Sequence, residues 1–162
     1  MTVAVVILNY NGKAHLERYL PSVLQHSTGH RVIVADNGST DDSLAFLSEN
    51  YPTVDTIEIP ENLGYTGGYN HVLKTLSEEV FVLLNSDVEV TENWIEPVVG
   101  LMSDPTIGAC QPKLLDHSDP EKFEYAGAAG GFLDTFGFPF CRGRIFQNMD
   151  CLLYTSPSPR DA

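Results

Sequence analysis

The first ninety residues alternate between apolar runs that favour strands and segments with helical periodicity, and this order limits the fold more than any other feature. Four runs rich in Val, Ile or Leu lie at residues 3–8, 31–36, 54–59 and 80–84. Runs of this length and composition predict strands that are buried on both faces. A repeated strand–helix order with short links predicts an α/β fold with a mostly parallel sheet, helices on both faces and right-handed crossovers.

The intervening segments carry helix signals of their own. Leu16, Leu20 and Val23 recur at helical spacing, although Pro21 is expected to break or bend that helix. Ser39 or Thr40 is predicted to cap the second helix, with two Asp residues in its first turn. Further predicted elements are a helix over residues 66–79, a helix over 92–103 and a strand over 107–115.

The periodicity weakens after residue 104. Residues 125–146 are rich in Gly and aromatic residues and predict loops with short edge strands. The last twelve residues change abruptly to a mixture of Ser, Pro, Arg and Asp without an element pattern. We therefore predict one domain over residues 1–150 and a disordered or non-native tail over residues 151–162.

Charge and cysteine content exclude several classes of function. The chain has 9 basic and 22 acidic residues and a net charge of −13, so it would repel a nucleic-acid backbone. Its 3 cysteines lack metal-binding or paired spacing, which argues against a zinc site or a disulfide framework. No apolar run approaches the length of a transmembrane helix. A phosphate-bearing ligand would need a cation or helix-end amides to offset the negative charge.

Each of the four predicted strands ends in a polar cluster. The clusters lie at residues 9–12, 36–41, 61–70 and 85–89. Ligands of parallel sheets bind outside the carboxyl ends of the strands, so these clusters predict a binding site along one rim. Taken alone, the sequence "NYNG" favours a simple turn over contact with a ligand.

Asp36 and the glycines of the third cluster allow two interpretations each. Asp36 is either a helix cap or an acceptor for an N–H group of a bound base, and the second is favoured because other residues already supply caps. Gly64, Gly67 and Gly68 do not follow the order of a dinucleotide-binding fingerprint. They suit either a close approach of the backbone to a ligand or close helix packing.

Asp87 is the strongest single candidate for a functional role. It follows the strand over residues 80–84 in the sequence "NSD", with Asn85 two positions before it. Mg²⁺ and Mn²⁺ prefer oxygen ligands and often combine one or two carboxylates with the phosphates of a substrate. Metal binding by Asp87 is favoured over a solvated turn residue, whereas Glu89 is expected to be solvated.

The ordered motifs "VVILNYNG", "VIVADNGSTDDS", "ENLGYTGGYN" and "LLNSDVEV" resemble family 2 glycosyltransferases of the GT-A fold. The similarity spans residues 3–150 and points to the rhamnosyltransferase-like enzymes of bacterial surface-polysaccharide synthesis. It implies inverting transfer of a hexosyl or rhamnosyl group from a UDP- or dTDP-sugar to a saccharide or lipid-linked acceptor. It also implies a cytoplasmic protein, or one bound at the inner face of the membrane, although no basic amphipathic helix supports membrane binding.

The resemblance implies roles for individual residues. Asp36 matches the acidic residue that recognises a pyrimidine base, and Asp87 matches a ligand of the divalent metal. The residues that match the other positions lining the nucleotide are Asn9, Tyr10, Asn62, Gly64 and Asn85. The general base of the family lies in an acidic motif downstream of "GRIFQNMD", and no equivalent precedes Ala162. We expect a GT-A domain whose C-terminal part is incomplete, and we do not assign the base to Asp134 or Asp150.

Two other classes remain open at this point. A nucleotidyltransferase also combines a nucleotide-binding fold with a metal-binding Asp, but it would need a basic, Gly-rich loop where "NYNGKAH" offers only Lys13. A non-catalytic module that binds a nucleotide sugar without turnover is consistent with the missing base.

Overall fold

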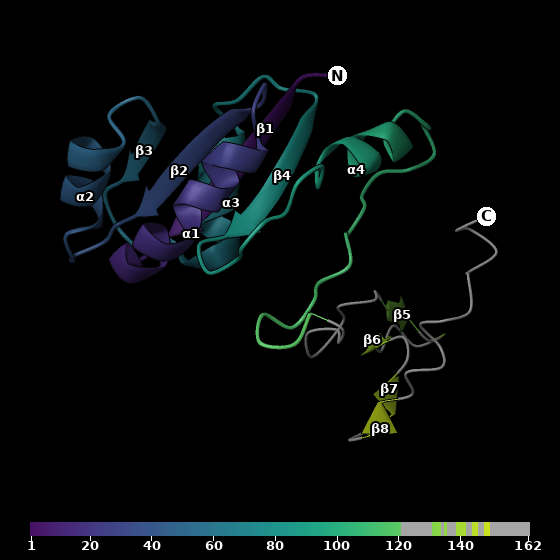
Figure 1. Cartoon of the computed structure of the whole chain (residues 1–162). Helices are drawn as coiled ribbons and strands as arrows, with labels where there is room; N and C mark the ends of the chain where they lie inside the picture. Colours follow the sequence, from purple (N-terminus) through teal and green to yellow (C-terminus); the bar gives the residue numbers. More distant parts are fainter. Residues whose placement is uncertain (121–130, 134, 136–138, 142–143, 146–147, 150–162) are drawn as a thin grey trace. The chain divides into compact units, whose positions relative to one another are not determined.

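The computed structural model describes residues 1–120, 131–133, 135, 139–141, 144–145 and 148–149 (Figure 1). The chain divides into two compact units, Met1–Gly100 and Leu101–Ala162. Residues 150–162 lie outside the described part, so the predicted domain end at residue 150 and the tail beyond it stay predictions.

The first unit contains a four-stranded parallel sheet. Its strands are β1 (Val3–Asn9), β2 (Arg31–Asn37), β3 (Asp55–Ile59) and β4 (Val80–Asn85), in the order β3-β2-β1-β4. The four predicted strands and the parallel sheet are thus confirmed. Three of them, β1, β2 and β4, extend one residue past the predicted end, and in each case that residue is an Asn.

The two faces of the sheet bury different residues, because successive side chains of a strand point to opposite sides. Ala4, Val6, Ile33 and Ala35 form a core with Val72 of α3 (Gly64–Leu73). Val5, Ile7 and Val34 alternate with them and are also buried. The helix α1 (Lys13–His26) covers this second face with three buried side chains, and Figure 1 shows α1 and α3 on opposite sides of the sheet.

The helices differ from the predicted ones mainly at their ends. The helix α1 continues through Pro21, because Pro21 is exposed and interrupts hydrogen bonding on the solvent side. The helix α2 (Ser43–Asn50) follows Asp42, so neither Ser39 nor Thr40 is its cap, and both take part in contacts described below. The helix α4 (Glu96–Leu101) is shorter than predicted, since Asn93 has a left-handed backbone with φ 58° that cannot continue a helix.

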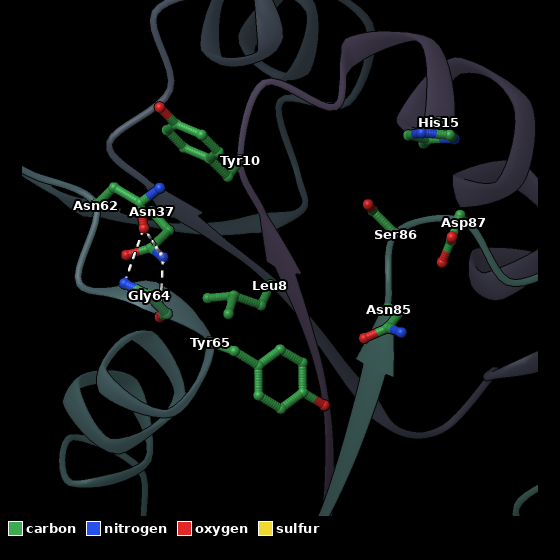
Figure 2. A pocket seen from close by; sticks show the side chains of 10 residues that line it. All are labelled: Leu8, Tyr10, His15, Asn37, Asn62, Gly64, Tyr65, Asn85, Ser86 and Asp87. Atoms are coloured by element: carbon green, nitrogen blue, oxygen red, sulfur yellow. Dashed lines mark hydrogen bonds between the residues drawn. The ribbon is translucent and has the colours of Figure 1, made fainter. Parts of the chain in front are cut away.

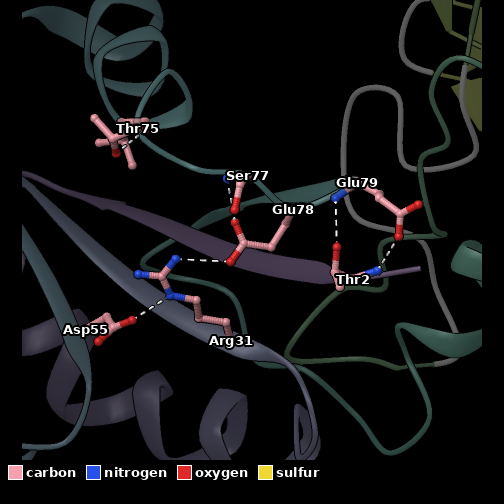
Figure 3. Close-up of polar contacts among 8 residues, drawn as sticks. Thr2, Arg31, Asp55, Thr75, Ser77, Glu78 and Glu79 are labelled. Atoms are coloured by element: carbon pink, nitrogen blue, oxygen red, sulfur yellow. Dashed lines mark hydrogen bonds and ion pairs between the residues drawn. The ribbon is translucent and has the colours of Figure 1, made fainter.

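Charged side chains pair with one another at the amino ends of the strands (Figure 3). Arg31 at the start of β2 donates from Nε to Asp55 at 2.6 Å and from Nη1 to Glu78 at 3.0 Å. The hydrogen bond to Arg31 lowers the pKa of the Glu78 carboxyl below its usual value. The backbone N–H of Thr2 donates to Glu79 at 2.8 Å, which fixes the start of β1 beside the start of β4.

The second unit contains two short antiparallel pairs among its described residues. They are β5 (Gly131–Leu133) with β6 (Pro139–Cys141) and β7 (Arg144–Ile145) with β8 (Asn148–Met149). The strand predicted over residues 107–115 is wrong: apart from one bridge residue, Leu115, this segment forms no strand. Pro112 removes a donor from its middle, which disfavours pairing. Asp134 and Asp150 lie outside the described residues, and no described helix is long and apolar enough to cross a membrane.

Candidate functional site

A pocket of about 380 Å³ opens at the carboxyl ends of β1 and β4. The strand β4 lies on one side of β1, while β2 and β3 lie on the other, so the strand order reverses between β1 and β4. Ligands of open parallel sheets bind at such a reversal. Ten residues line the pocket: Leu8, Tyr10, His15, Asn37, Asn62, Gly64, Tyr65, Asn85, Ser86 and Asp87.

The lining residues form two walls, and the ring of Tyr65 extends from the first wall toward the second below Leu8 (Figure 2). The first, which we call the amide wall, consists of Tyr10, Asn37, Asn62, Gly64 and Tyr65. The second, which we call the Asp87 wall, consists of His15, Asn85, Ser86 and Asp87. Rings and neutral amides therefore face a wall that carries the only carboxylate among the lining residues.

Asn37 builds the amide wall by joining the end of β2 to the start of α3. Its Nδ2 donates to Asn62 Oδ1 at 3.0 Å and to the Gly64 carbonyl at 3.1 Å, and its Oδ1 accepts from Leu63 N–H at 3.0 Å. Gly64 has a left-handed backbone with φ 71°, which favours glycine at this point of the loop. The side chain of Asn37 is thus fully used in shaping the wall, while Asn62 remains exposed.

Two tyrosines give the amide wall exposed aromatic surface. Tyr10 is 50% exposed and Tyr65 is 59% exposed. Tyr65 lies edge-on to Tyr69, with 4.9 Å between the ring centroids. Tyr69 is buried and donates its hydroxyl to the Leu84 carbonyl at 3.0 Å, and burial raises the pKa of its phenol. A buried, hydrogen-bonded ring therefore supports one that is open to a ligand.

The Asp87 wall combines the turn after β4 with the first turn of α1. Asn85 and Asp87 are exposed, and no three His, Cys, Asp or Glu side chains cluster to hold a metal anywhere in the described residues. A magnesium-like ion does not require such a cluster, since it commonly takes one or two carboxylates, water and substrate phosphates. The oxygen atoms of Asp87, Asn85 and Ser86 are of the chemical type that fits such an ion.

Asp36 and Asn9 are buried at the same ends of β1 and β2 and are not among the residues that line the pocket. Asp36 is 1% exposed and Asn9 is 0% exposed. The two residues are paired across β1 and β2, and Asn9 Nδ2 donates to Asp36 Oδ1 at 2.9 Å while Ser39 N–H donates to Asp36 Oδ2 at 2.9 Å. Since Asp36 and Asn37 are consecutive in β2, they point to opposite faces, and Asn37 is the one that faces the pocket.

Asn11 shows that "NYNG" is more than the simple turn favoured from the sequence. Its backbone has the left-handed φ of 51° expected in a turn. Its side chain also accepts from the Thr40 N–H at 2.7 Å, while Asp41 Oδ2 accepts from the Lys13 N–H at 3.1 Å. We call this reciprocal contact between the β1–α1 and β2–α2 loops the loop clasp.

The loop clasp also changes the acidity of Asp41. Asp41 is exposed, and slight desolvation opposes its ionisation, but hydrogen bonds from Ser43 and from the Lys13 backbone outweigh this effect and lower the pKa of the Asp41 carboxyl. The ionised form of Asp41 is thus the one that the folded loops favour.

Sequence reasoning missed five lining residues, namely Leu8, His15, Asn37, Tyr65 and Ser86. The alternation of β1 could have identified Leu8, because Tyr10 lies two positions later. Asn37, Tyr65 and Ser86 belong to the polar clusters recognised at the rim, but the sequence did not indicate which members face the pocket. His15 lies within a helix, where no rim signal exists.

A model of the family described as "Glycosyl transferase family 2" matches residues 4–151. The chain belongs to glycosyl transferase family 2. The family membership inferred from the four ordered motifs is therefore confirmed, and so is the GT-A fold.

The family 2 chain is similar to enzymes of known and unknown activity. It is 30% identical over 125 residues to an N-acetylglucosaminyl-diphospho-decaprenol L-rhamnosyltransferase of Mycobacterium tuberculosis, covering 69% of this chain and 41% of that protein. It is 34% identical over 93 residues to the uncharacterized glycosyltransferase YfnE of Bacillus subtilis, covering 54% of this chain and 24% of that protein. The chain thus spans less than half the length of these relatives.

Two solved structures share the fold of this family 2 chain. A mannosyltransferase of Pyrobaculum calidifontis in complex with GDP-Man and Mn²⁺ has a TM-score of 0.60 at 23% identity, covering 68% of this chain and 35% of that one. TarS 1–349 of S. aureus in complex with UDP has a TM-score of 0.55 at 18% identity, covering 72% of this chain and 40% of that one.

Proposed function

We propose that the pocket binds a nucleoside-diphosphate sugar together with Mg²⁺ or Mn²⁺. The observation that carries this proposal is the position of Asn85 and Asp87 at the tip of β4, opposite exposed rings and amides at the reversal of strand order. A base and ribose suit the amide wall, while the diphosphate and the metal suit the Asp87 wall. Neighbours whose structures hold GDP-Man and Mn²⁺ or UDP support the same class of ligand.

Each wall has a distinct task in this proposal. Tyr10 offers a ring face for the base, and the exposed Asn62 and the backbone of Gly64 approach the nucleotide. Asp87 holds the divalent ion and Asn85 contributes an oxygen beside it. When bound, the ion supplies Lewis-acid stabilisation of the negative charge on the departing nucleoside diphosphate. Because the chain carries a net charge of −13, this contribution is needed for it to hold a second anion.

Asp36 and Asn9 are proposed to act on the nucleotide indirectly, through the neighbouring residues that line the pocket. Their buried pair holds the ends of β1 and β2 in register, which fixes Tyr10 and Asn37 above it. Direct reading of a pyrimidine base by Asp36 would require this carboxylate to leave Asn9 or Ser39 and turn toward the pocket. We therefore propose that Asp36 positions the nucleotide-binding residues, and that base contact is its role only after such a rearrangement.

The reaction proposed for the whole protein is inverting transfer of a sugar to a saccharide or lipid-linked acceptor. The name of the M. tuberculosis relative, a rhamnosyltransferase that acts on a decaprenol-linked sugar, supports a lipid-linked acceptor. A role in surface-polysaccharide synthesis and action at a membrane surface belong to the same proposal. No general base is assigned, because neither Asp134 nor Asp150 occupies the position of the family's acidic motif, and both lie outside the described residues. A UDP- or dTDP-sugar is the proposed donor, and a GDP-sugar is the alternative to compare in binding experiments.

Calorimetry with UDP, dTDP and GDP, each with and without Mn²⁺, tests this proposal. Mn²⁺ is expected to strengthen binding of at least one diphosphate, and Asp87→Ala should reduce that metal-dependent gain about tenfold or more. Glu89→Ala is the matched control, because Glu89 is an exposed carboxylate two residues away that does not line the pocket. Binding that is unaffected by both Mn²⁺ and Asp87→Ala would contradict the proposal, and an assay of sugar release would separate turnover from binding alone.

A further inference from the structure

His15 is placed to contact a ligand but has no role in the proposal above. It lies in the first turn of α1 and contributes to the Asp87 wall, as Figure 2 shows. Its side chain is exposed, and no hydrogen bond joins its ring to another described residue. Both ring nitrogens are therefore available to a group that enters the pocket, and a neutral imidazole provides one N–H donor and one acceptor.

The backbone and ring of His15 are held in place from two directions. Its N–H donates to the Gly12 carbonyl at 2.9 Å, and the neighbouring Lys13 N–H is fixed by Asp41 through the loop clasp. Its ring stacks on Tyr19, one turn later in α1, with 6.3 Å between the centroids and an interplanar angle of 17°. A donor that is oriented before the ligand arrives loses little conformational entropy on binding.

The chemistry of the Asp87 wall shows what His15 would bind. Among the described residues, no Lys or Arg lines the pocket, so the phosphates of a nucleotide would meet one carboxylate and neutral groups there. A divalent ion on Asp87 occupies only some of the phosphate oxygens, and the others need hydrogen-bond donors. The donors on this wall are the Asn85 amide, the Ser86 hydroxyl and the ring of His15, which reaches the pocket from a different element.

We propose that His15 donates a hydrogen bond to a phosphate oxygen of the bound nucleoside diphosphate. This inference rests on the proposed function, and it assigns His15 as a residue that, beside the metal site at Asp87, discriminates a diphosphate from the bare nucleoside. The contact is a direct one to the ligand and is distinct from metal ligation by Asp87.

The test compares two ligands that differ only in the phosphates. Kd is measured by calorimetry for UDP and for uridine, each with and without Mn²⁺, on the full chain; dTDP with thymidine, or GDP with guanosine, replaces this pair if that diphosphate binds more tightly. His15→Ala is expected to weaken diphosphate binding about fivefold to tenfold in both metal conditions and to leave nucleoside binding unchanged. His15→Gln, which keeps an N–H donor, should recover most of the loss. His71→Ala is the control, because His71 is exposed on α3 and does not line the pocket.

Each other outcome overturns a defined part of the argument. Equal losses for the diphosphate and the nucleoside would show that His15 acts through the shape of the pocket. A loss confined to the Mn²⁺ condition would make it a metal ligand instead of a phosphate donor. Unchanged diphosphate binding in His15→Ala overturns this inference and leaves the proposed function intact, whereas a wild-type chain that binds none of the three diphosphates overturns both.

Discussion

Arg31 at the amino end of β2 forms ion pairs with the exposed Asp55 and with Glu78, whose side chain is 13% exposed, whereas Asp36 near the carboxyl end of the same strand is buried and held by uncharged donors. The two ends are five residues apart, yet they use polar side chains differently. At the amino end, charges satisfy each other in contact with water. At the carboxyl end, a buried layer of polar groups, Asn9 and Asp36, adjoins Tyr10 and Asn37, which line the pocket.

This difference follows from the energies of the two kinds of contact. An exposed ion pair contributes little to stability, because water solvates the separated charges nearly as well. A buried carboxylate must be fully hydrogen-bonded, so removing one of its donors costs more than the pair itself is worth. The buried layer at the carboxyl end therefore tolerates few changes, and that rigidity holds the outer residues in position for a ligand.

Replacing Gly38, at the carboxyl end of β2, should reduce stability more than any other substitution considered for this strand. Gly38 follows β2 with φ 75°, and a Cβ there would lie 2.7 Å from the backbone carbon of Glu61 and 2.8 Å from the backbone nitrogen of Asn62. Gly38→Ala must therefore displace the loop that carries Asn62. We expect the free energy of unfolding, measured by urea titration, to fall by about 2–4 kcal/mol.

Gly29→Ala is the matched control at the other end of β2. Gly29 also has a left-handed backbone, with φ 91°, but no atom lies within 4 Å of the added Cβ. Gly29→Ala therefore measures only the cost of placing an L-residue in a left-handed backbone conformation, which is roughly 1–2 kcal/mol. Equal losses in the two variants would show that the contact with Glu61 and Asn62 adds nothing.

Asp→Asn substitutions at Asp36 in β2 and Asp55 in β3 should lower the free energy of unfolding by different amounts. In Asp36→Asn one of the two donors, Asn9 Nδ2 or Ser39 N–H, faces an amide NH₂ group if the Asn9 amide keeps its present orientation, in which its Oδ1 has no partner. We expect a loss of about 1–3 kcal/mol in the free energy of unfolding. Asp55→Asn at the exposed Arg31 pair should cost less than about 1 kcal/mol. Urea titration of both variants measures the difference, and a larger loss in Asp55→Asn would reverse our interpretation of the two ends.

The sequence predicted the sheet better than the site, and particular residues explain why. The apolar runs of β1 to β4 are local signals, so the strands were correct to within one residue. That one residue matters at the site, because extension of β2 to Asn37 turns Asn37 toward the pocket and Asp36 away from it. The loop clasp joins Asn11 to Thr40 across 29 positions, and His15 enters the pocket from a helix. Contacts of this kind depend on tertiary packing, which a local pattern does not contain.

Acid titration should reveal the smallest difference between the two ends. The pKa values of Asp41 in the loop clasp and Glu78 in the Arg31 pair are both lowered by folding. A carboxyl with a lowered pKa stabilises the fold above its unfolded pKa of about 4, and this contribution is lost as the pH falls through the folded value. The wild-type free energy of unfolding should therefore decrease between about pH 5 and pH 3.

Single variants assign that decrease to one end or the other. Asp41→Asn and Glu78→Gln should each flatten the slope of stability against pH, measured by urea titration at a series of pH values. Ser43→Ala should flatten it in the same sense as Asp41→Asn, because Ser43 supplies hydrogen bonds that favour the ionised Asp41. The effect of Asp41→Asn is expected to be less than about 1 kcal/mol at the acidic limit, since that carboxyl is exposed. A slope that changes in Glu78→Gln but not in Asp41→Asn would mean that the loop clasp does not depend on a carboxylate and is held by the hydrogen bond between Asn11 and Thr40.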